Sequence, residues 1–88
     1  MELHNYTEKV VREVLDDILA KREGICKCEK CRLDMMAIAL NNLQPQYYVS
    51  NKGEVFSKLQ ATYMEMRTKV LTEVTKATML VERQPQHP

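Results

Sequence analysis

The sequence predicts a small all-α domain of three to four helices, with a cysteine-bearing loop and a long C-terminal helix, assembled as a symmetric dimer. Three observations favour this class. Apolar residues recur at helical spacing, the 88 residues include only 2 glycines and 3 prolines, and the 3 cysteines fall close together. Because a chain this short buries only about 60% of its unfolded surface, such domains commonly gain stability from a metal ion or a second chain.

The first expected helix covers residues 5–23. Its apolar side chains recur on one face, at Val10, Val11, Val14, Leu15, Ile18 and Leu19. Asn5 followed by Glu8 has the spacing of a capping box, with asparagine in the capping position. Gly24 suits the position just after the helix end, because glycine takes positive φ without steric cost.

A second helix is expected to begin at Glu29 or Cys31 and to end at Leu43, because Pro45 disfavours helical angles at the residue before it. Its main apolar stripe is predicted to contain Leu33, Met36, Ala37, Leu40 and Leu43, and the stripe is widened by Met35, Ile38 and Ala39. So much apolar surface predicts a central helix that is covered on more than one side.

Residues 46–49 are expected to be extended, and the turn-forming residues 50–53 follow them. The rest of the sequence offers no evident partner strand, so no sheet is predicted.

The longest helix is expected from Glu54 to about Arg83. Its apolar residues step by three or four positions: Phe56, Leu59, Tyr63, Met66, Val70, Val74, Ala77 and Val81. Such a helix would be about 45 Å long, whereas a compact globule of this size is about 30 Å across. We therefore expect its far half to extend beyond the domain and to pack against a second copy. The alternative is a kink near residues 68–72 that folds the helix back.

The methionines of the helices are expected to be adaptable core residues, at positions 35, 36, 64, 66 and 79. Residues 1–83 are then a single domain, and the polar segment 84–88 is expected to be a disordered tail.

Charge and hydropathy exclude several classes of protein. Thirteen Lys and Arg against twelve Asp and Glu give a net charge of +1, which provides no field for gathering DNA, so no direct DNA binding is expected. No apolar run approaches the roughly 18–20 residues that span a bilayer. The N-terminal segment has an acidic residue and no apolar core of a secretory signal. We expect a cytoplasmic protein that does not insert into a membrane.

The strongest chemical signal is the cluster of Cys26, Cys28 and Cys31. An odd number of cysteines without an export signal argues against disulfides. Thiolates at this spacing, in a loop that opens a helix, suit one metal ion, and zinc is expected because iron–sulfur clusters normally take four cysteines. No fourth ligand is evident, since His4 and His87 lie toward the chain ends; a water or a ligand from a second copy remains open. The alternative is three reduced thiols without a metal.

Enzymatic interpretations lack the residues that they need. Neither histidine lies near a cysteine, so no Cys–His nucleophile is expected. Cys28 and Cys31 form a C-x-x-C pair, but a redox dithiol of this kind acts in a βαβ setting that the sequence does not predict. With two glycines in all, the chain has no glycine-rich phosphate loop. We therefore expect no catalytic activity.

One family combines these features. The strings CKCEKCRLD (residues 26–34), AIALN (37–41), LQP (43–45), YV (48–49) and KG (52–53) resemble the ComFB family of late competence development proteins in bacteria. The likeness covers about residues 5–60, and it departs at residue 44, where many relatives carry a proline. It implies an all-α, zinc-binding dimer that is associated with DNA uptake and is not an enzyme. Cys26, Cys28 and Cys31 match the metal motif of the family.

The resemblance leaves two functions open. One is a structural or interaction component that contacts another competence protein. The other is a receptor for a cyclic dinucleotide, either cyclic di-AMP or cyclic di-GMP, because cyanobacterial relatives look like such receptors. Candidate ligand contacts are Arg32 and Lys52 for phosphate, and Tyr47 and Tyr48 for stacking on a purine. We rank the interaction component first, because the metal motif falls on residues that are present here.

Overall fold

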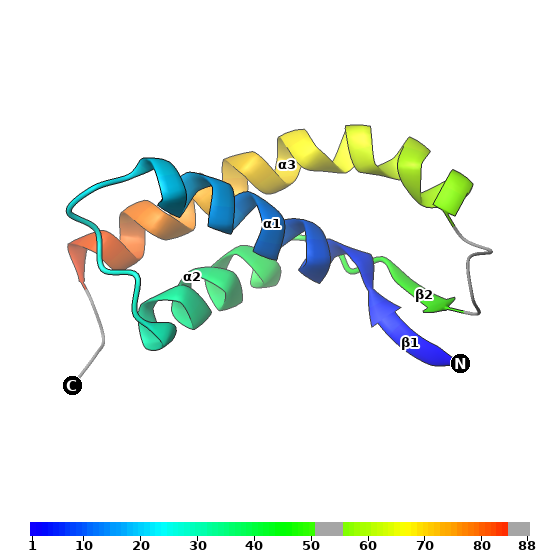
Figure 1. The fold of residues 1–88 in the computed structure, drawn as a ribbon, viewed down its shortest axis with the longest axis horizontal. Helices are drawn as coiled ribbons and strands as arrows, with labels where there is room; N and C mark the ends of the chain where they lie inside the picture. Colours follow the sequence, from blue (N-terminus) through cyan, green and yellow to red (C-terminus); the bar gives the residue numbers. More distant parts are fainter. Residues whose placement is uncertain (51–55, 85–88) are drawn as a thin grey trace.

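Three helices and a two-stranded ribbon make up the computed structural model, which describes residues 1–50 and 56–84 (the backbone only for residue 50 and residues 56–62). In chain order the elements are β1 (Glu2–Asn5), α1 (Tyr6–Lys21), α2 (Glu29–Asn41), β2 (Tyr47–Ser50) and α3 (Phe56–Arg83). Both α1 and α2 lie along α3, and the ribbon projects at one end (Figure 1). The prediction of a mostly helical domain with a cysteine loop and a long C-terminal helix is confirmed.

The core lies where the three helices face one another. Its buried apolar residues are Val10, Val11, Val14, Leu15 and Leu19 of α1, Ile25 of the following loop, Cys31, Met35, Met36 and Ala39 of α2, and Val70, Val74, Ala77 and Val81 of α3. Burying a large aliphatic side chain contributes about 1.5–3 kcal/mol, so this cluster is the main source of stability. The expected apolar face of the first helix is confirmed, except that Ile18 is only half-buried.

The prediction that the far half of the long helix extends beyond its own domain is wrong. Val70, Val74 and Val81 are at most 4% exposed within a single chain. The reason is shape: α1 and α2 lie lengthwise against α3, so the molecule is 41 Å long and matches the helix in length. α3 is assigned as one helix throughout, so it does not fold back near residues 68–72. The predicted overhang of α3 therefore does not support the expected dimer.

The face of α2 that enters the core also differs from the prediction. Leu33 is 52% exposed and Ala37 is exposed, although both were expected in the main stripe, whereas Met36 is buried as expected. Cys31, Met35 and Ala39 are also buried, and the last two belong to the set that was expected to widen the stripe. Apolar residues surround most of this helix, so its own sequence does not select one face. The packing of Cys31 at its first turn selects the residues four and eight positions later.

The absence of a sheet is a further prediction that the structure corrects. β1 pairs antiparallel with β2, from Glu2 opposite Ser50 to Asn5 opposite Tyr47. The His4 ring stacks on the Tyr48 ring with centroids 5.2 Å apart, and both belong to the face of the ribbon that also meets Tyr6. Leu3 and Val49, which point to the other face, stay largely exposed.

Asn5 fixes the ribbon to the helices. Its Oδ1 accepts the N–H of Thr7 at 3.2 Å, which caps α1 as expected, and it also accepts the N–H of Gln46 at 2.9 Å. The Tyr6 N–H donates to the Gln46 carbonyl at 2.7 Å, and the Thr7 hydroxyl donates to the Gln44 carbonyl at 2.8 Å. The start of α1 is thus bonded to the segment that follows α2.

Small differences remain at the ends of the elements. α1 ends at Lys21 with Arg22 as its C-cap, so Gly24, with φ of +78°, lies one position beyond the place expected for it. The predicted turn at residues 51–53, the first two residues of the expected long helix (54–55) and the tail residues 85–88 lie outside the described residues.

Candidate metal centre

A tight turn before α2 brings the cysteines together. Cys28 is the N-cap of α2, and its Sγ accepts the N–H of Cys31 at 3.4 Å. The N–H of Arg32 donates to the Cys28 carbonyl at 3.0 Å. The chain therefore turns back at Cys28, so that the first turn of the helix carries Cys31 toward the two cysteines of the loop.

The three Sγ atoms of Cys26, Cys28 and Cys31 lie within 4.8 Å of one another, and none of them forms a disulfide. Ligand atoms about 2.3 Å from a tetrahedral zinc ion are about 3.8 Å apart, so the thiols need to approach by only about 1 Å. The predicted metal ligands are therefore brought together.

The fourth coordination position has no ligand from the part of the chain that the structure describes, because the cluster there consists of the three cysteines. His4 belongs to β1, at the end of the bundle away from the cysteine loop, with its Nε2 3.3 Å from Glu2 (Figure 1). His87 lies outside the described residues.

The thiols differ in acidity. Burial, and secondarily the neighbouring thiols of Cys26 and Cys28, together raise the pKa of Cys31 to about 12. The pKa of Cys28 is lowered, chiefly because its sulfur accepts the backbone N–H of Cys31 and secondarily through the Cys26 thiol. A buried thiol beside two others keeps its proton unless a cation compensates the charge, and a divalent ion does so. This all-thiol donor set fits zinc, a borderline-soft ion that binds cysteine well.

The surroundings of the cluster connect it to α3. A cavity of about 160 Å³ beside Cys26 and Cys31 is lined by the apolar Ile25, Met35 and Val81, and by Glu82 at its rim. Both carboxylate oxygens of Glu82 accept hydrogen bonds from Arg22, at 2.8 and 2.9 Å. An ion held here would fix the α1–α2 loop against the last turns of α3.

The predicted ligand contacts do not form one site. Arg32 pairs with Asp16 of α1 at the start of α2. Tyr47 is 65% exposed on the outer face of the ribbon, whereas the Tyr48 hydroxyl accepts a hydrogen bond from Lys9 at 2.6 Å. Both tyrosines follow the far end of α2, a helix about 20 Å long. Lys52 lies outside the described residues.

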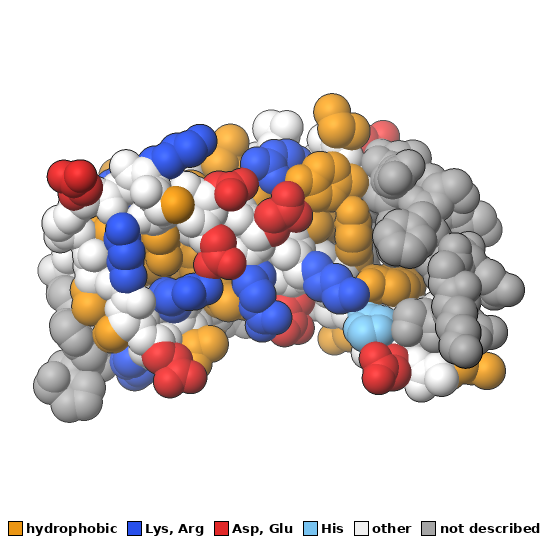
Figure 2. Space-filling model, viewed as in Figure 1, with side chains coloured by type: hydrophobic (Ala, Val, Ile, Leu, Met, Phe, Trp, Pro, Cys, Tyr) orange, Lys and Arg blue, Asp and Glu red, His pale blue; other side chains and the backbone are white. Residues whose placement is uncertain are grey.

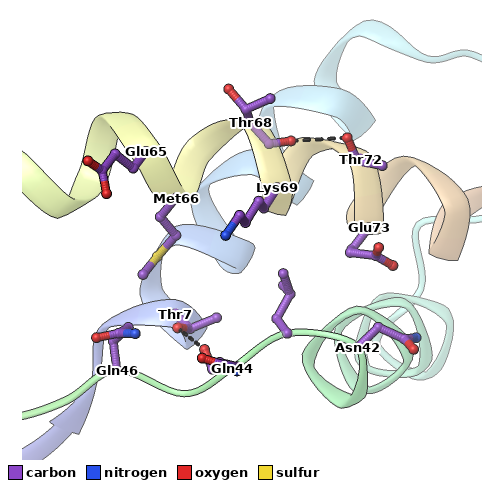
Figure 3. A pocket seen from close by; sticks show the side chains of 11 residues that line it. Thr7, Asn42, Gln44, Gln46, Glu65, Met66, Thr68, Lys69, Thr72 and Glu73 are labelled. Atoms are coloured by element: carbon purple, nitrogen blue, oxygen red, sulfur yellow. Dashed lines mark hydrogen bonds between the residues drawn. The ribbon is translucent and has the colours of Figure 1, made fainter.

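A polar cleft of about 510 Å³ between α3 and the segment 42–46 has no counterpart in the sequence predictions. Met66 and Lys69 extend from α3 toward Gln44 and Gln46, with Glu65 and Glu73 on either side (Figure 3). The cleft arises where a loop packs against a helix distant in sequence. The sequence feature that could indicate this cleft is the run of Asn and Gln around Pro45, and such a run is equally typical of an ordinary exposed loop.

Comparison with known proteins identifies the family. The chain matches the model of the late competence development protein ComFB over residues 4–85. The chain belongs to the ComFB family. It is 26% identical over 83 residues to the competence protein ComFB of Bacillus subtilis (strain 168), covering 94% of this chain and 85% of that protein. It also resembles the solved structure of ComFB from Bacillus subtilis, with a TM-score of 0.77, 26% identity, and coverage of 97% of this chain and 93% of the other.

The ComFB family membership confirms the resemblance that the cysteine motif and the strings after it predicted. The likeness to the solved ComFB structure covers 97% of the chain, so it includes the helices as well as the cysteine motif.

Proposed function

We propose that this protein is a non-catalytic, zinc-binding component of bacterial competence for DNA uptake, which acts as a homodimer and through contact with another competence protein. The observation that carries the proposal is the convergence of three Sγ atoms within 4.8 Å in a chain of the ComFB family. Cys26, Cys28 and Cys31 would hold the ion, and zinc would supply structural cross-linking of the loop. A water or a ligand from a second copy would complete its coordination.

The residues around the thiols support a structural role over a catalytic one. The described residues place no histidine or carboxylate in the thiol cluster, and a nucleophilic cysteine needs a base within hydrogen-bond reach. Lys30 and Arg32, the nearest cations of α2, are engaged with Asp34 and Asp16. The site therefore offers ligands for an ion without the acid–base groups of a reaction.

Charge and hydropathy support a protein that contacts other proteins. No helix in the described ranges is long and apolar enough to cross a membrane. In Figure 2 acidic side chains lie on both sides of the basic ones, and the net charge of +1 provides no field for gathering duplex DNA. We place the protein in the cytoplasm and propose no direct contact with DNA or lipid.

Zinc titration against a chromophoric chelator tests the proposal. We expect wild type to compete for one zinc ion per chain and Cys28→Ser to lose at least tenfold in affinity. Lys27→Ala, which changes the same loop but removes no thiol, is the matched control and is expected to bind as wild type does. Equal zinc affinities for wild type and Cys28→Ser would contradict the proposed site.

The second candidate is the cyclic dinucleotide receptor that the family resemblance supplies. The described geometry favours it less, because Arg32 lies apart from Tyr47 and Tyr48, and the polar cleft carries two glutamates against one lysine. Calorimetric titration with cyclic di-AMP and cyclic di-GMP tests it. We expect no binding; micromolar affinity that is lost on Arg32→Ala would place the receptor first.

A further inference from the structure

Cys28 and Cys31 lie three residues apart across the first turn of α2. Cys28 is the N-cap, and its carbonyl accepts the N–H of Arg32 at 3.0 Å, so the backbone between the two cysteines forms a closed helical turn. Two Cα atoms three residues apart on such a turn are about 5 Å apart. Disulfides join Cα atoms about 4.4–6.8 Å apart. The backbone of this turn therefore already has the spacing that a disulfide requires.

The two sulfur atoms need only a small movement to bond. They lie within 4.8 Å of each other, and the Cys28 Sγ is 3.4 Å from the backbone nitrogen of Cys31. An S–S bond is about 2.05 Å long, so the distance to close is less than about 3 Å. Rotation of the Cys28 side chain can supply this movement, because that side chain is exposed whereas Cys31 is packed in the core.

Cys26 is less suited to a disulfide with either of them. A bond to Cys28 would close a ring through Lys27 alone, and very short loops are stiff. A bond to Cys31 would have no helical turn to set its spacing, because Cys26 lies in the loop before α2. The geometry therefore favours Cys28 and Cys31 as the disulfide pair and leaves Cys26 as a thiol.

Exposure decides which of the two sulfurs meets an oxidant first. Cys28 is exposed, whereas Cys31 is buried. Cysteine oxidation follows access to solvent, and reactive cysteines often stand beside a second thiol that resolves the oxidised one. A small oxidant therefore reaches Cys28, and Cys31 meets the oxidised sulfur from within the same turn.

We infer that Cys28 and Cys31 are a site of oxidative modification, at which hydrogen peroxide converts the metal-free thiols to a disulfide. The Cys28 sulfur attacks one peroxide oxygen, the O–O bond breaks, and the products are a sulfenic acid on Cys28 and one water. The Cys31 sulfur then attacks the Cys28 sulfur, the S–O bond breaks, and the departing hydroxide takes the Cys31 proton to form a second water. In total two thiols lose two electrons and two protons, and one peroxide is reduced to two waters. This is a modification of the chain and not a turnover, so it needs no βαβ setting.

The disulfide and the proposed ion compete for the same sulfurs. With Cys28 and Cys31 bonded to each other, Cys26 is the one thiol that remains in the described cluster, and structural zinc requires about four ligands. Conversely, an ion that holds both sulfurs withdraws them from peroxide. This competition rests on the proposed zinc site, whereas the disulfide itself needs no ion.

The two states would constrain the chain differently. The disulfide closes a single helical turn within α2, so it connects nothing beyond that turn. An ion shared with Cys26 fixes the α1–α2 loop, which lies against Val81 and Glu82 of α3. Oxidation would therefore release the loop from α3 while it preserves the start of α2.

Tryptic peptide mapping of the full chain after peroxide treatment tests the inference, because trypsin cuts after Lys27, Lys30 and Arg32 and separates the three cysteines. Metal-free wild type is treated with peroxide, alkylated and digested, with circular dichroism to establish that it is folded. We expect peptide 28–30 to be joined to peptide 31–32, in about tenfold excess over the two other pairings. In urea, where the turn is absent, we expect this excess to be lost. A bond to Cys26 in most molecules, or the same distribution in urea, would overturn the inference.

Two variants identify the pair. Cys26→Ser removes a thiol of the same cluster and is the matched control, so it should form the disulfide as fast as wild type does. Cys28→Ser should form an intramolecular disulfide about tenfold more slowly, because the exposed sulfur is gone. Equal rates for Cys28→Ser and wild type would show that Cys28 does not react first and would contradict the mechanism.

A second measurement adds one equivalent of zinc before the peroxide and follows its release with a chromophoric chelator. We expect disulfide formation to slow about tenfold and one zinc ion to be released for each disulfide formed. Disulfide formation at the same rate with and without zinc would overturn the competition and count against the zinc site, and would leave the disulfide standing. A chain that binds zinc but whose metal-free thiols resist peroxide would overturn this inference and leave the proposed function standing.

Discussion

The two ends of this bundle are held together by different means. At one end, three cysteines within six residues converge beside the last turns of α3. At the other end, β1 and β2 come from opposite sides of α1 and α2 in sequence, and they are joined by backbone pairing, the Asn5 side chain and the stacked rings of His4 and Tyr48. The cysteine end relies on local sequence and, in our proposal, on an ion; the ribbon end relies on contacts between distant segments.

Removal of metal should separate the two ends most strongly. We expect chelation to lower the free energy of unfolding by several kcal/mol, because the binding energy of a structural ion contributes directly to folding. Hydrogen exchange should show the loss of protection around Ile25 and Met35, with less change at the ribbon amides of Leu3 and Val49. Equal loss at both ends would contradict a local role for the ion.

Two serine variants refine this prediction. Cys28 is exposed and Cys31 is buried, so in metal-free protein Cys28→Ser should cost little, whereas Cys31→Ser should already destabilise the core. With zinc present, both variants should forfeit the stabilisation that the ion confers on wild type. A cost for Cys28→Ser that is the same with and without zinc would show that its thiol does not act through the ion.

Acid should weaken the cysteine end before it affects the ribbon. The pKa of Cys31 is raised to about 12 by burial and by its thiol neighbours, so at neutral pH this thiol must lose its proton when an ion binds. Zinc affinity should therefore fall as pH falls, by at least about 100-fold from pH 8 to pH 6 for one displaced proton. Chelator competition at the two pH values measures this, and an affinity independent of pH would contradict thiolate ligation by Cys31.

The ribbon end should respond to Asn5→Ala. The change removes both the cap of α1 and the acceptor for the Gln46 N–H, and we expect a loss of about 2 kcal/mol. Asn5→Asp keeps an acceptor oxygen and should cost little. Asn42→Ala, which removes an exposed bond to the Ile38 carbonyl, is the control, with an expected loss below about 0.5 kcal/mol in urea unfolding. A loss for Asn5→Ala no larger than this control would contradict the role of Asn5.

The smallest expected difference in stability is between variants of the two adjacent tyrosines, Tyr47 and Tyr48. Tyr48→Ala removes the ring stacked on His4 and the edge contact with Tyr6, and we expect a loss of about 1 kcal/mol. Tyr47→Ala changes a largely exposed ring on the other face of the ribbon and should lie within about 0.5 kcal/mol of wild type. Equal losses in thermal unfolding would show that the stacking does not stabilise the ribbon.

The cysteine end could be predicted from sequence because its information is local. Helix periodicity, the capping position of Asn5 and three thiols within six residues each act over a turn or two of chain, so the three helices and the convergent thiols were predictable. Helix formation and short metal motifs depend on neighbours in sequence.

The ribbon end could not be predicted in the same way. Strands of four residues, such as Glu2–Asn5, carry little pattern, and their pairing depends on a partner more than forty residues away. The spacing of Asn5 and Glu8 indicates a helix cap, but it does not indicate that the Asn5 Oδ1 also accepts the Gln46 N–H.

The inward face of α2 could be predicted only in part, because its apolar residues surround the helix. Tertiary packing then exposed Leu33 and buried Met35. The prediction that Met64 and Met79 are core residues is wrong, since they are 73% and 44% exposed. The reason is related: a methionine at helical spacing suits a core and a surface equally.

Elemental analysis of the purified chain, folded and washed free of loosely bound metal, is the most direct test of the metal centre. We predict one zinc ion per chain for wild type and a substoichiometric amount for the variant in which Cys26, Cys28 and Cys31 are all serine. Wild-type protein that folds and is equally stable with no bound metal would contradict the account.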